Sequence, residues 1–146
     1  MRLETAQPIA KRVKEELTPH CERIEIAGSI RREKPESALT IPSILATMGT
    51  ITLNGSKIKR LHYGDADINI DIYTATPASW STLLLIRTGS KENNIRLATI
   101  AKRKGWQLKA NGDGLFNNHG DRIAGDTEES IYQVLGIPYQ EPHDRH

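Results

Sequence analysis

The stretch that decides the fold spans residues 70–106, IDIYTATPASWSTLLLIRTGSKENNIRLATIAKRKGW. It places one carboxylate, Asp71, on an apolar strand, followed by a short helix and a Thr-Gly-Ser turn that opens a second helix. The second helix carries a single acid, Glu92, and is otherwise basic. Its cations are Lys91, Arg96, Lys102, Arg103 and Lys104. An acid on a strand and bases on a helix, joined by a glycine turn, suit the handling of polyphosphate or nucleic acid.

Charge is unevenly distributed along the chain. The 146 residues carry 20 basic and 18 acidic side chains, a net charge of only +2. Residues 87–109 hold seven basic residues and one acid, whereas residues 111–146 hold seven acids and two bases. The asymmetry predicts one basic face on a protein that is not basic as a whole, and a merely solvated helix face is the alternative.

Length and composition set further bounds. A chain of this length suits one ordinary domain or two small lobes. It has no apolar run long enough to span a membrane and no signal-peptide pattern at its start. One cysteine, Cys21, excludes an intrachain disulfide and fits a reducing compartment, so a cytoplasmic location is predicted.

Periodicity and turn residues predict alternating strands and helices. Strands are expected at 23–27, 50–53, 57–63, 67–74, 107–110, 114–117 and 122–124, and helices at 5–18, 80–86, 91–104 and 127–135, with 37–48 weakly helical. Asn54-Gly55 predicts a hairpin turn, Ser90 a helix cap, and Asp126 with Glu129 a capping box. Composition shifts near Pro77, which predicts a strand-rich lobe over residues 1–76 and a helix-led lobe over residues 77–146.

Two segments and the tail resemble a known family. Residues 27–32, AGSIRR, resemble the Gly-Ser-x-Arg-Arg turn of the family-X (polymerase beta-like) DNA polymerases, within the nucleotidyltransferase superfamily. Residues 70–106 resemble the end of that family's palm and the start of its thumb, and GLF, TEESIY and LGIPYQEP in the tail resemble the rest of the thumb. The resemblance implies an α+β fold: a nucleotidyltransferase-like palm remnant with a mixed sheet and helices, plus a small thumb.

The resemblance also implies nucleotide-binding residues. Gly28 and Ser29 lie in the Gly-Ser turn and, with Arg32, would hold the triphosphate of an incoming nucleotide. Exposed backbone N–H groups and the bidentate guanidinium suit that ligand. Gly89 lies where the family's backbone approaches the nucleotide, and Asn94 where a side chain touches the base. Each also has a structural explanation: the glycines as turn residues and Asn94 as a first-turn polar residue.

A nucleic-acid surface is predicted beside these residues. It consists of the basic side chains of the second helix and of the residue just before its turn: Arg87, Lys91, Arg96, Lys102, Arg103 and Lys104. DNA, a nucleoside triphosphate, or both are the predicted partners, and no membrane is expected.

The predicted metal site is incomplete. Asp71 matches the third carboxylate of the family's metal triad, which implies Mg²⁺ as cofactor. The acidic pair that the family carries soon after its Gly-Ser turn does not follow Arg32, and Ile86 and Arg87 stand where the family has aromatic residues. Two-metal phosphoryl transfer needs carboxylates that converge on ions about 4 Å apart, which one aspartate does not supply.

A substitute acidic pair exists in the sequence. Asp65 and Asp67 follow Gly64 with the spacing of the family's pair. If both lie on the strand of Asp71, Asp67 is about 13 Å from Asp71 at 3.3 Å per residue, too far to share a metal. A sharp bend between them would rescue the site, although Ile68, Ile70 and Ile72 alternate cleanly.

Three functions follow from these patterns. The first is a small DNA polymerase or nucleotidyltransferase with impaired or absent catalysis, and the second is a catalytically dead module that binds nucleic acid or nucleotide. The third is a folded relic. A palm that lacks an inner strand leaves open sheet edges, which predicts a homodimer or strand-exchanged oligomer.

Overall fold

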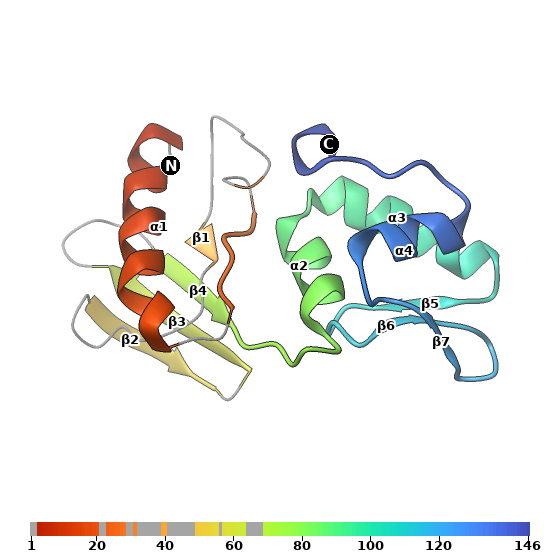
Figure 1. The fold of residues 1–146 in the computed structure, drawn as a ribbon, viewed down its shortest axis with the longest axis horizontal. Helices are drawn as coiled ribbons and strands as arrows, with labels where there is room; N and C mark the ends of the chain where they lie inside the picture. Colours follow the sequence, from red (N-terminus) through yellow and green to blue (C-terminus); the bar gives the residue numbers. More distant parts are fainter. Residues whose placement is uncertain are drawn as a thin grey trace. The chain divides into compact units, whose positions relative to one another are not determined.

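The computed structural model describes residues 3–20, 23–28, 31, 39–40, 49–55, 57–63 and 69–146. The chain comprises two compact units, Met1–Thr74 and Ala75–His146 (Figure 1). Each unit combines helices with a small sheet, so the predicted α+β class is confirmed.

In the described residues, the first unit packs helix α1 on a mixed sheet. Its elements are α1 (Leu3–Leu17), a 3₁₀ turn (Thr18–His20), β1 (Leu39–Thr40), β2 (Gly49–Asn54), β3 (Ile58–Tyr63) and β4 (Asn69–Tyr73). The strand order is β1-β4-β3-β2, with β1 parallel to β4 and the other pairs antiparallel. The hairpin predicted at Asn54-Gly55 joins β2 to β3, where the Gly55 N–H donates to the Ile58 carbonyl at 2.9 Å.

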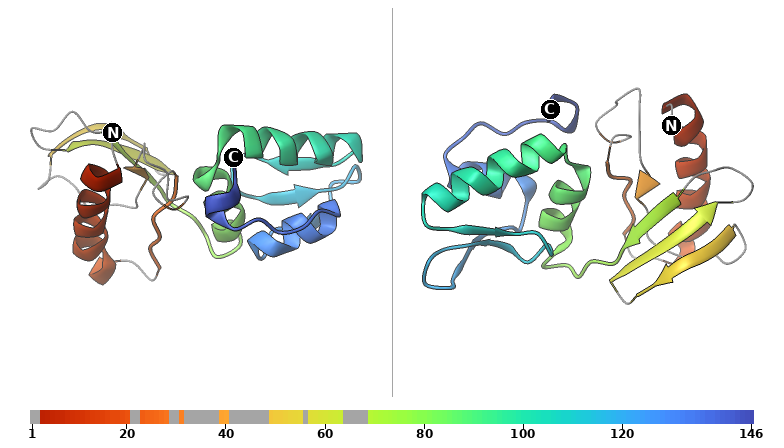
Figure 2. Two further views of the ribbon diagram at one scale, coloured as in Figure 1. Left: turned by 90° about the horizontal axis from the view of Figure 1, so that it is seen from above. Right: turned by 180° about the vertical axis from the view of Figure 1, so that it is seen from behind.

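Strand alternation decides which face of this sheet is covered. Ile70 and Ile72 of β4 are buried with Leu61 of β3, while Asp71 between them lies on the opposite face. Helix α1 covers the apolar face, as the left view of Figure 2 shows. Its contribution to the core is Ala10, Val13 and Leu17.

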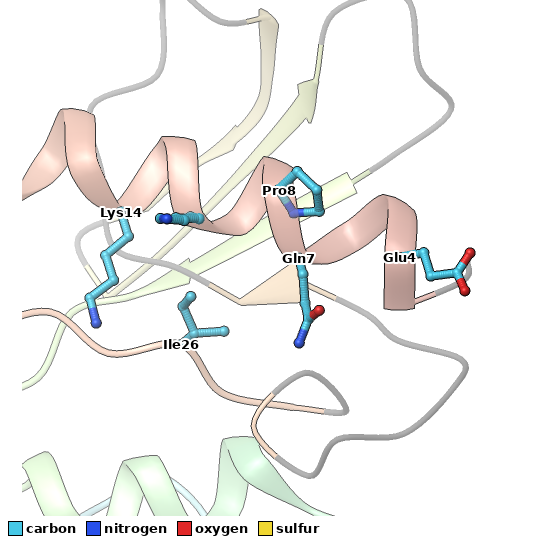
Figure 3. A pocket seen from close by; sticks show the side chains of 6 residues that line it. Glu4, Gln7, Pro8, Lys14 and Ile26 are labelled. Atoms are coloured by element: carbon cyan, nitrogen blue, oxygen red, sulfur yellow. The ribbon is translucent and has the colours of Figure 1, made fainter.

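A shallow groove runs beside α1. Exposed or half-buried side chains of one helix stripe line it, together with Ile26 from the following segment (Figure 3). Its volume is about 660 Å³. The helical lining residues are Glu4, Gln7, Pro8, Lys11 and Lys14.

Two local predictions need correction. The strand predicted at residues 23–27 is wrong, because these positions join no strand ladder within the described residues, although Ile24 and Ala27 are buried. Apolar alternation alone does not make a strand; a paired neighbour does. The helix predicted at 37–48 lies largely outside the described residues, and its described pair, Leu39–Thr40, is strand β1.

The second unit places helices against a three-stranded sheet. Its elements are α2 (Trp80–Thr88), α3 (Lys91–Arg103), β5 (Gln107–Lys109), β6 (Gly114–Phe116), β7 (Arg122–Ala124), α4 (Glu128–Leu135) and a final 3₁₀ turn (Pro142–Asp144). The strand order is β5-β6-β7, antiparallel throughout. Figure 1 shows α3 and α4 on the same side of these strands.

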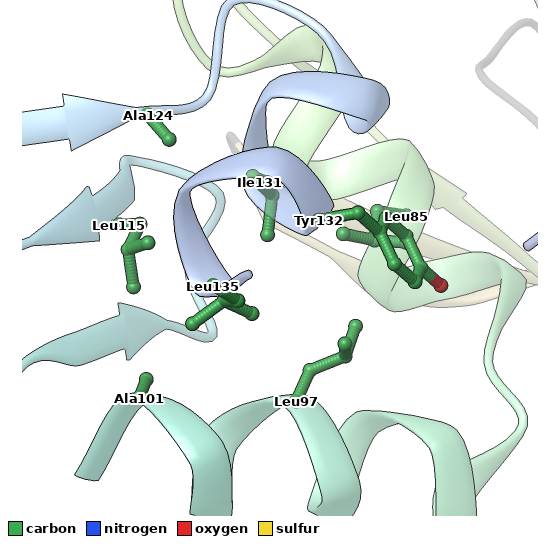
Figure 4. Packing of buried hydrophobic residues seen from close by; sticks show 8 residues of the cluster. All are labelled: Leu85, Leu97, Ala101, Leu115, Ala124, Ile131, Tyr132 and Leu135. Atoms are coloured by element: carbon green, nitrogen blue, oxygen red, sulfur yellow. The ribbon is translucent and has the colours of Figure 1, made fainter. Parts of the chain in front are cut away.

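Helices α2, α3 and α4 and strands β6 and β7 each contribute a buried residue to the core of this unit. Tyr132 of α4 is 0% exposed, and its hydroxyl accepts from Asn93 Nδ2 of α3 at 3.1 Å. The aliphatic residues gather around it (Figure 4). They are Leu85, Leu97, Ala101, Leu115, Ala124, Ile131 and Leu135.

Arg122 ties the entry of α2 to the sheet. Its Nη2 donates to the Ala78 carbonyl and its Nε to the Asp113 carbonyl, both at 2.9 Å, and its Nη1 lies 2.7 Å from Asp126. Gly125 leaves room for this guanidinium, since a Cβ there would lie 2.7 Å from Arg122 Nη2, and its φ of +138° disfavours other residues.

Candidate nucleic-acid interface and the Asp71 position

Helix α3 is built to present cations. Ser90 caps it by accepting from the Asn93 N–H at 3.2 Å, as predicted, and the chain turns away at Gly105 with φ +77°. Asn93, Leu97 and Ala101 form its buried stripe. The opposite face is therefore exposed along the whole helix.

The exposed face has a charged row with an apolar centre. Lys91 and Lys102 lie on one stripe, eleven residues or roughly 16 Å apart along the axis, with Ile95 between them at 55% exposure. Arg103 lies beside Lys102 on the neighbouring stripe. In the described part of the chain, Lys91, Lys102 and Arg103 form no ion pair.

Two of the other predicted cations, Arg96 and Lys104, are engaged within the unit, and the third, Arg87, is half-buried. Arg96 donates from Nη2 to Asn93 Oδ1 at 3.3 Å and also to Gln140 Oε1. Lys104 lies 5.5 Å over the Trp106 ring. Arg87 is half-buried in the last turn of α2. The cations most open to a ligand are thus Lys91, Lys102 and Arg103.

The turn before α3 contains Gly89 and is held by Asn94, which lies in the first turn of α3. Gly89 is buried with φ +70° and is joined to Ser90 by a cis peptide bond. Asn94 is half-buried, and its Nδ2 donates to the Ile86 carbonyl at 2.8 Å, which satisfies a carbonyl at the end of α2. Its Oδ1 is buried without a partner among the described residues. Asn94 therefore positions this turn, a role that sequence reasoning missed.

The predicted triphosphate residues are only partly described. Gly28 is half-buried in a turn with φ +75°, directly after the buried Ala27. Ser29 and Arg32 lie outside the described residues, and so do Asp65 and Asp67.

Asp71 faces a cation from its own sheet. The β3–β4 register sets Arg60 directly across from Asp71. Arg60 Nε donates to Oδ1 at 2.5 Å and Nη2 donates to Oδ2 at 2.9 Å, a bidentate pair. This hydrogen bond and the charge of Asp71 raise the pKa of Arg60 above its ordinary value.

The residues described around Asp71 do not fit a two-metal centre. On its other side, β1 sets Thr40 level with Asp71 and Leu39 level with Ile70, and neither of these two residues is a carboxylate. Both Asp71 oxygens accept from the guanidinium of Arg60. The described parts of the chain contain no cluster of three or more metal-ligating side chains.

Arg60 is the residue of this site that sequence reasoning missed. Its alternation with Leu61 on β3 predicts the solvent-facing side of the strand, but the register with β4 is a tertiary feature.

None of the helices in the described residues is long and apolar enough to cross a membrane.

The second unit contains two helices joined by a tight glycine turn, a three-stranded sheet and a capped last helix. Residues 83–146 match the family described as DNA polymerase beta thumb. This match and the two relatives below support the family-X polymerase-like resemblance that the sequence predicts.

Two individual proteins show the extent of the similarity. DNA polymerase lambda of Rattus norvegicus is 29% identical over 91 residues, which cover 56% of this chain and 16% of that protein. The chain thus spans about a sixth of that relative. The crystal structure of Leishmania infantum polymerase beta in a ternary P/T complex matches all of this chain and 76% of its own, with a TM-score of 0.80 at 17% identity, which establishes the fold.

Proposed function

We propose that this chain binds DNA through the exposed face of α3 and has lost efficient nucleotidyl transfer. One observation carries the proposal: Lys91, Lys102 and Arg103 stand along the exposed face of a thumb helix without ion-pair partners among the described residues. Unpaired cations on a rigid helix neutralise phosphates and release counterions, which supplies sequence-independent affinity.

The centre of that face suits a nucleic-acid groove. Ile95 is exposed at 55% between the flanking lysines, and Ala98 beside it is small and exposed. An apolar centre with cations at both ends matches a ligand whose charge lies at its edges and whose interior is less polar, as in a duplex groove.

The state of Asp71 supports the loss of catalysis. Family-X polymerases generally use Mg²⁺, and two-metal transfer needs several carboxylates around the ions. Here Arg60 holds both oxygens of Asp71, and Thr40 and Leu39 occupy the adjacent strand. A polymerase with Asp65 and Asp67 as the missing ligands is the alternative. Gly28, Ser29, Arg32, Gly89 and Asn94 remain the proposed nucleotide-binding residues in either case.

Equilibrium binding of a labelled DNA duplex in EDTA tests the proposal. We expect Lys102→Gln/Arg103→Gln to weaken binding several-fold relative to the unmodified chain. Lys11→Gln/Arg12→Gln is the matched control, since it removes an adjacent Lys-Arg pair from an exposed stretch of α1 in the other unit. Equal losses in both variants would contradict a specific role for α3.

Primer extension with Mg²⁺ separates the two functions. We expect no extension above background from the unmodified chain. The polymerase alternative would be favoured if the unmodified chain extends the primer, if Asp71→Asn abolishes this extension, and if Asp65→Asn or Asp67→Asn, tested separately, abolishes it too.

Two further expectations stay predictions. The homodimer or strand-exchanged oligomer rests on open sheet edges, and β2 is an outer strand with a bulge between Ile51 and Leu53. Light scattering at high protein concentration decides between monomer and dimer. A cytoplasmic location rests only on the sequence.

A further inference from the structure

The open face of the first unit's sheet carries a polar cluster built around Arg60. On β3, Arg60 alternates with the buried Leu61, and on β4, Asp71 alternates with the buried Ile70 and Ile72. Helix α1 packs on the buried side (Figure 2). Arg60 and Asp71 therefore face away from the core.

The guanidinium of Arg60 is held in one orientation. Nε and Nη2 both donate to Asp71, which fixes the plane of the group. None of the described residues accepts from Nη1. The side chain of Arg60 is 45% exposed and that of Asp71 is 23% exposed, so the carboxylate lies behind the guanidinium.

This arrangement resembles a carboxylate that holds a cation toward a ligand. A divalent metal on Asp71 would present a positive charge to phosphate oxygens. The guanidinium lies against the same two oxygens and offers two remaining N–H bonds on Nη1. We propose that Arg60 takes the place of a metal ion on Asp71 and binds a phosphate group directly, without a divalent cation.

The surroundings of Arg60 suit a phosphate. Beside the pair, His62 Nδ1 and Asn69 Oδ1 lie 3.4 Å apart on the same face, so donors and acceptors continue along the strands. Asp71 is the one carboxylate of β3 and β4, and its charge is already matched by Arg60. An arriving phosphate therefore meets a fixed donor pair and no uncompensated acid from these strands.

Asp71 is a positioning residue in this proposal. Holding the arginine fork in place before the ligand arrives lowers the conformational entropy lost on binding. The site lies in the first unit and does not depend on α3, so it extends the proposed function and stands or falls separately from it.

Two probes distinguish the sources of the phosphate. Inorganic pyrophosphate represents the phosphates of a nucleotide, and a short unphosphorylated oligo-thymidylate represents the diesters of a strand. Both are titrated in EDTA into the full chain carrying Lys102→Gln/Arg103→Gln, which removes the α3 contribution. The side-chain Nε–H signals of arginine are followed by NMR.

We expect the Nε–H signal of Arg60 to shift saturably with at least one probe. This signal is assigned to Arg60 because it is missing from the spectrum of Arg60→Lys. That variant keeps the charge but loses the fork, and should weaken binding several-fold. Arg12→Gln, which removes an arginine on α1 that donates to Tyr63, should leave binding unchanged. The backbone spectrum of each variant reports whether it is folded, and Arg60→Gln serves as a second test.

Three results would overturn the inference. One is an Arg60 signal that neither probe shifts. Another is unchanged affinity in a folded Arg60→Lys or Arg60→Gln variant. The third is binding that requires Mg²⁺ and disappears in Asp71→Asn, which would make Asp71 a metal ligand.

Discussion

The buried ion pair between Arg145 and Glu128 should hold the end of the chain on the second unit. Arg145 is 0% exposed, and its Nη1 lies 3.1 Å from Glu128 Oε1. Its Nε donates to the Gln140 carbonyl at 3.0 Å and its Nη2 to the Tyr139 hydroxyl at 3.2 Å. The guanidinium also lies 5.6 Å from the Tyr132 ring. The contacts with Glu128 and Tyr132 thus fasten the final segment to α4, and those with Tyr139 and Gln140 hold the segment itself in shape.

The change to make is Arg145→Met, which keeps much of the volume and removes the charge. Removing one partner of a buried pair typically costs about 3–5 kcal/mol, because the other charge stays in a poorly solvated site. For a unit of this size, each kcal/mol corresponds to about 4–8 °C in Tm. The expected loss in Tm is therefore at least about 12 °C.

Urea unfolding followed by tryptophan fluorescence measures the loss in the free energy of unfolding, and thermal unfolding with the same signal measures the loss in Tm. Both tryptophans of the chain, Trp80 and Trp106, lie in the second unit, so the signal reports that unit alone. His143→Gln is the control in the same segment. His143 and Asp144 pair with side chains 55% and 59% exposed, and such pairs contribute about 0–1 kcal/mol.

A loss below about 1 kcal/mol in Arg145→Met would refute this reasoning, because it would place Arg145 among ordinary surface ion pairs. The double variant Arg145→Met/Glu128→Leu provides a further check. If the cost comes from a stranded charge, replacing both partners with apolar residues should recover much of the lost stability.

Three further predictions concern the same unit and use the same fluorescence assay. Tyr132→Phe should cost about 1–3 kcal/mol, because the buried Asn93 Nδ2 loses its acceptor; an unchanged urea midpoint would contradict this. Burial, and to a smaller extent the charge of Glu128, raises the pKa of Tyr139, so the stability linked to this proton is complete below about pH 10 and is lost as the pH rises through the raised folded-state pKa. Tyr139→Phe should flatten the alkaline decline of the urea midpoint, and an identical decline in both proteins would exclude Tyr139 as its source. Thr127→Ala should cost about 1 kcal/mol, because Thr127 Oγ1 accepts from the Ser130 N–H at the start of α4; a cost near zero would show that the cap contributes little.

Local rules predicted the helices of the second unit well. The Ser90 cap and the Gly105 stop bound α3, and both depend only on neighbouring residues. The capping box of α4 was predicted one residue early, with Asp126 and Glu129. The structure uses Thr127 and Ser130, while Asp126 accepts from Arg122. The sequence pattern asks for Glu or Gln three residues after the cap, which Glu129 supplies and Ser130 does not, and it does not contain the contact of Asp126 with Arg122.

The first unit contains pairings that local sequence rules do not predict. Alternation correctly placed β4 and its buried isoleucines, since each strand needs only one apolar face. The strand predicted at 23–27 failed because a ladder requires a partner. The Arg60–Asp71 pair depends on the register between β3 and β4, two strands whose pairing a periodicity does not specify. Arg145 was missed because it lies in a tail without periodicity, 17 residues from its partner Glu128 in α4.

The salt dependence of DNA binding in EDTA is the sharpest test of DNA binding through the exposed face of α3. The logarithm of the binding constant should fall linearly with the logarithm of salt concentration, with a slope of about −0.9 for each phosphate contacted. Lys102→Gln/Arg103→Gln should make that slope shallower by about 1.8. The affinity lost between 50 and 200 mM salt should then be about tenfold smaller than in the unmodified chain. Lys11→Gln/Arg12→Gln should leave the slope unchanged. Binding without salt dependence, or an unchanged slope in Lys102→Gln/Arg103→Gln, would contradict DNA binding through α3.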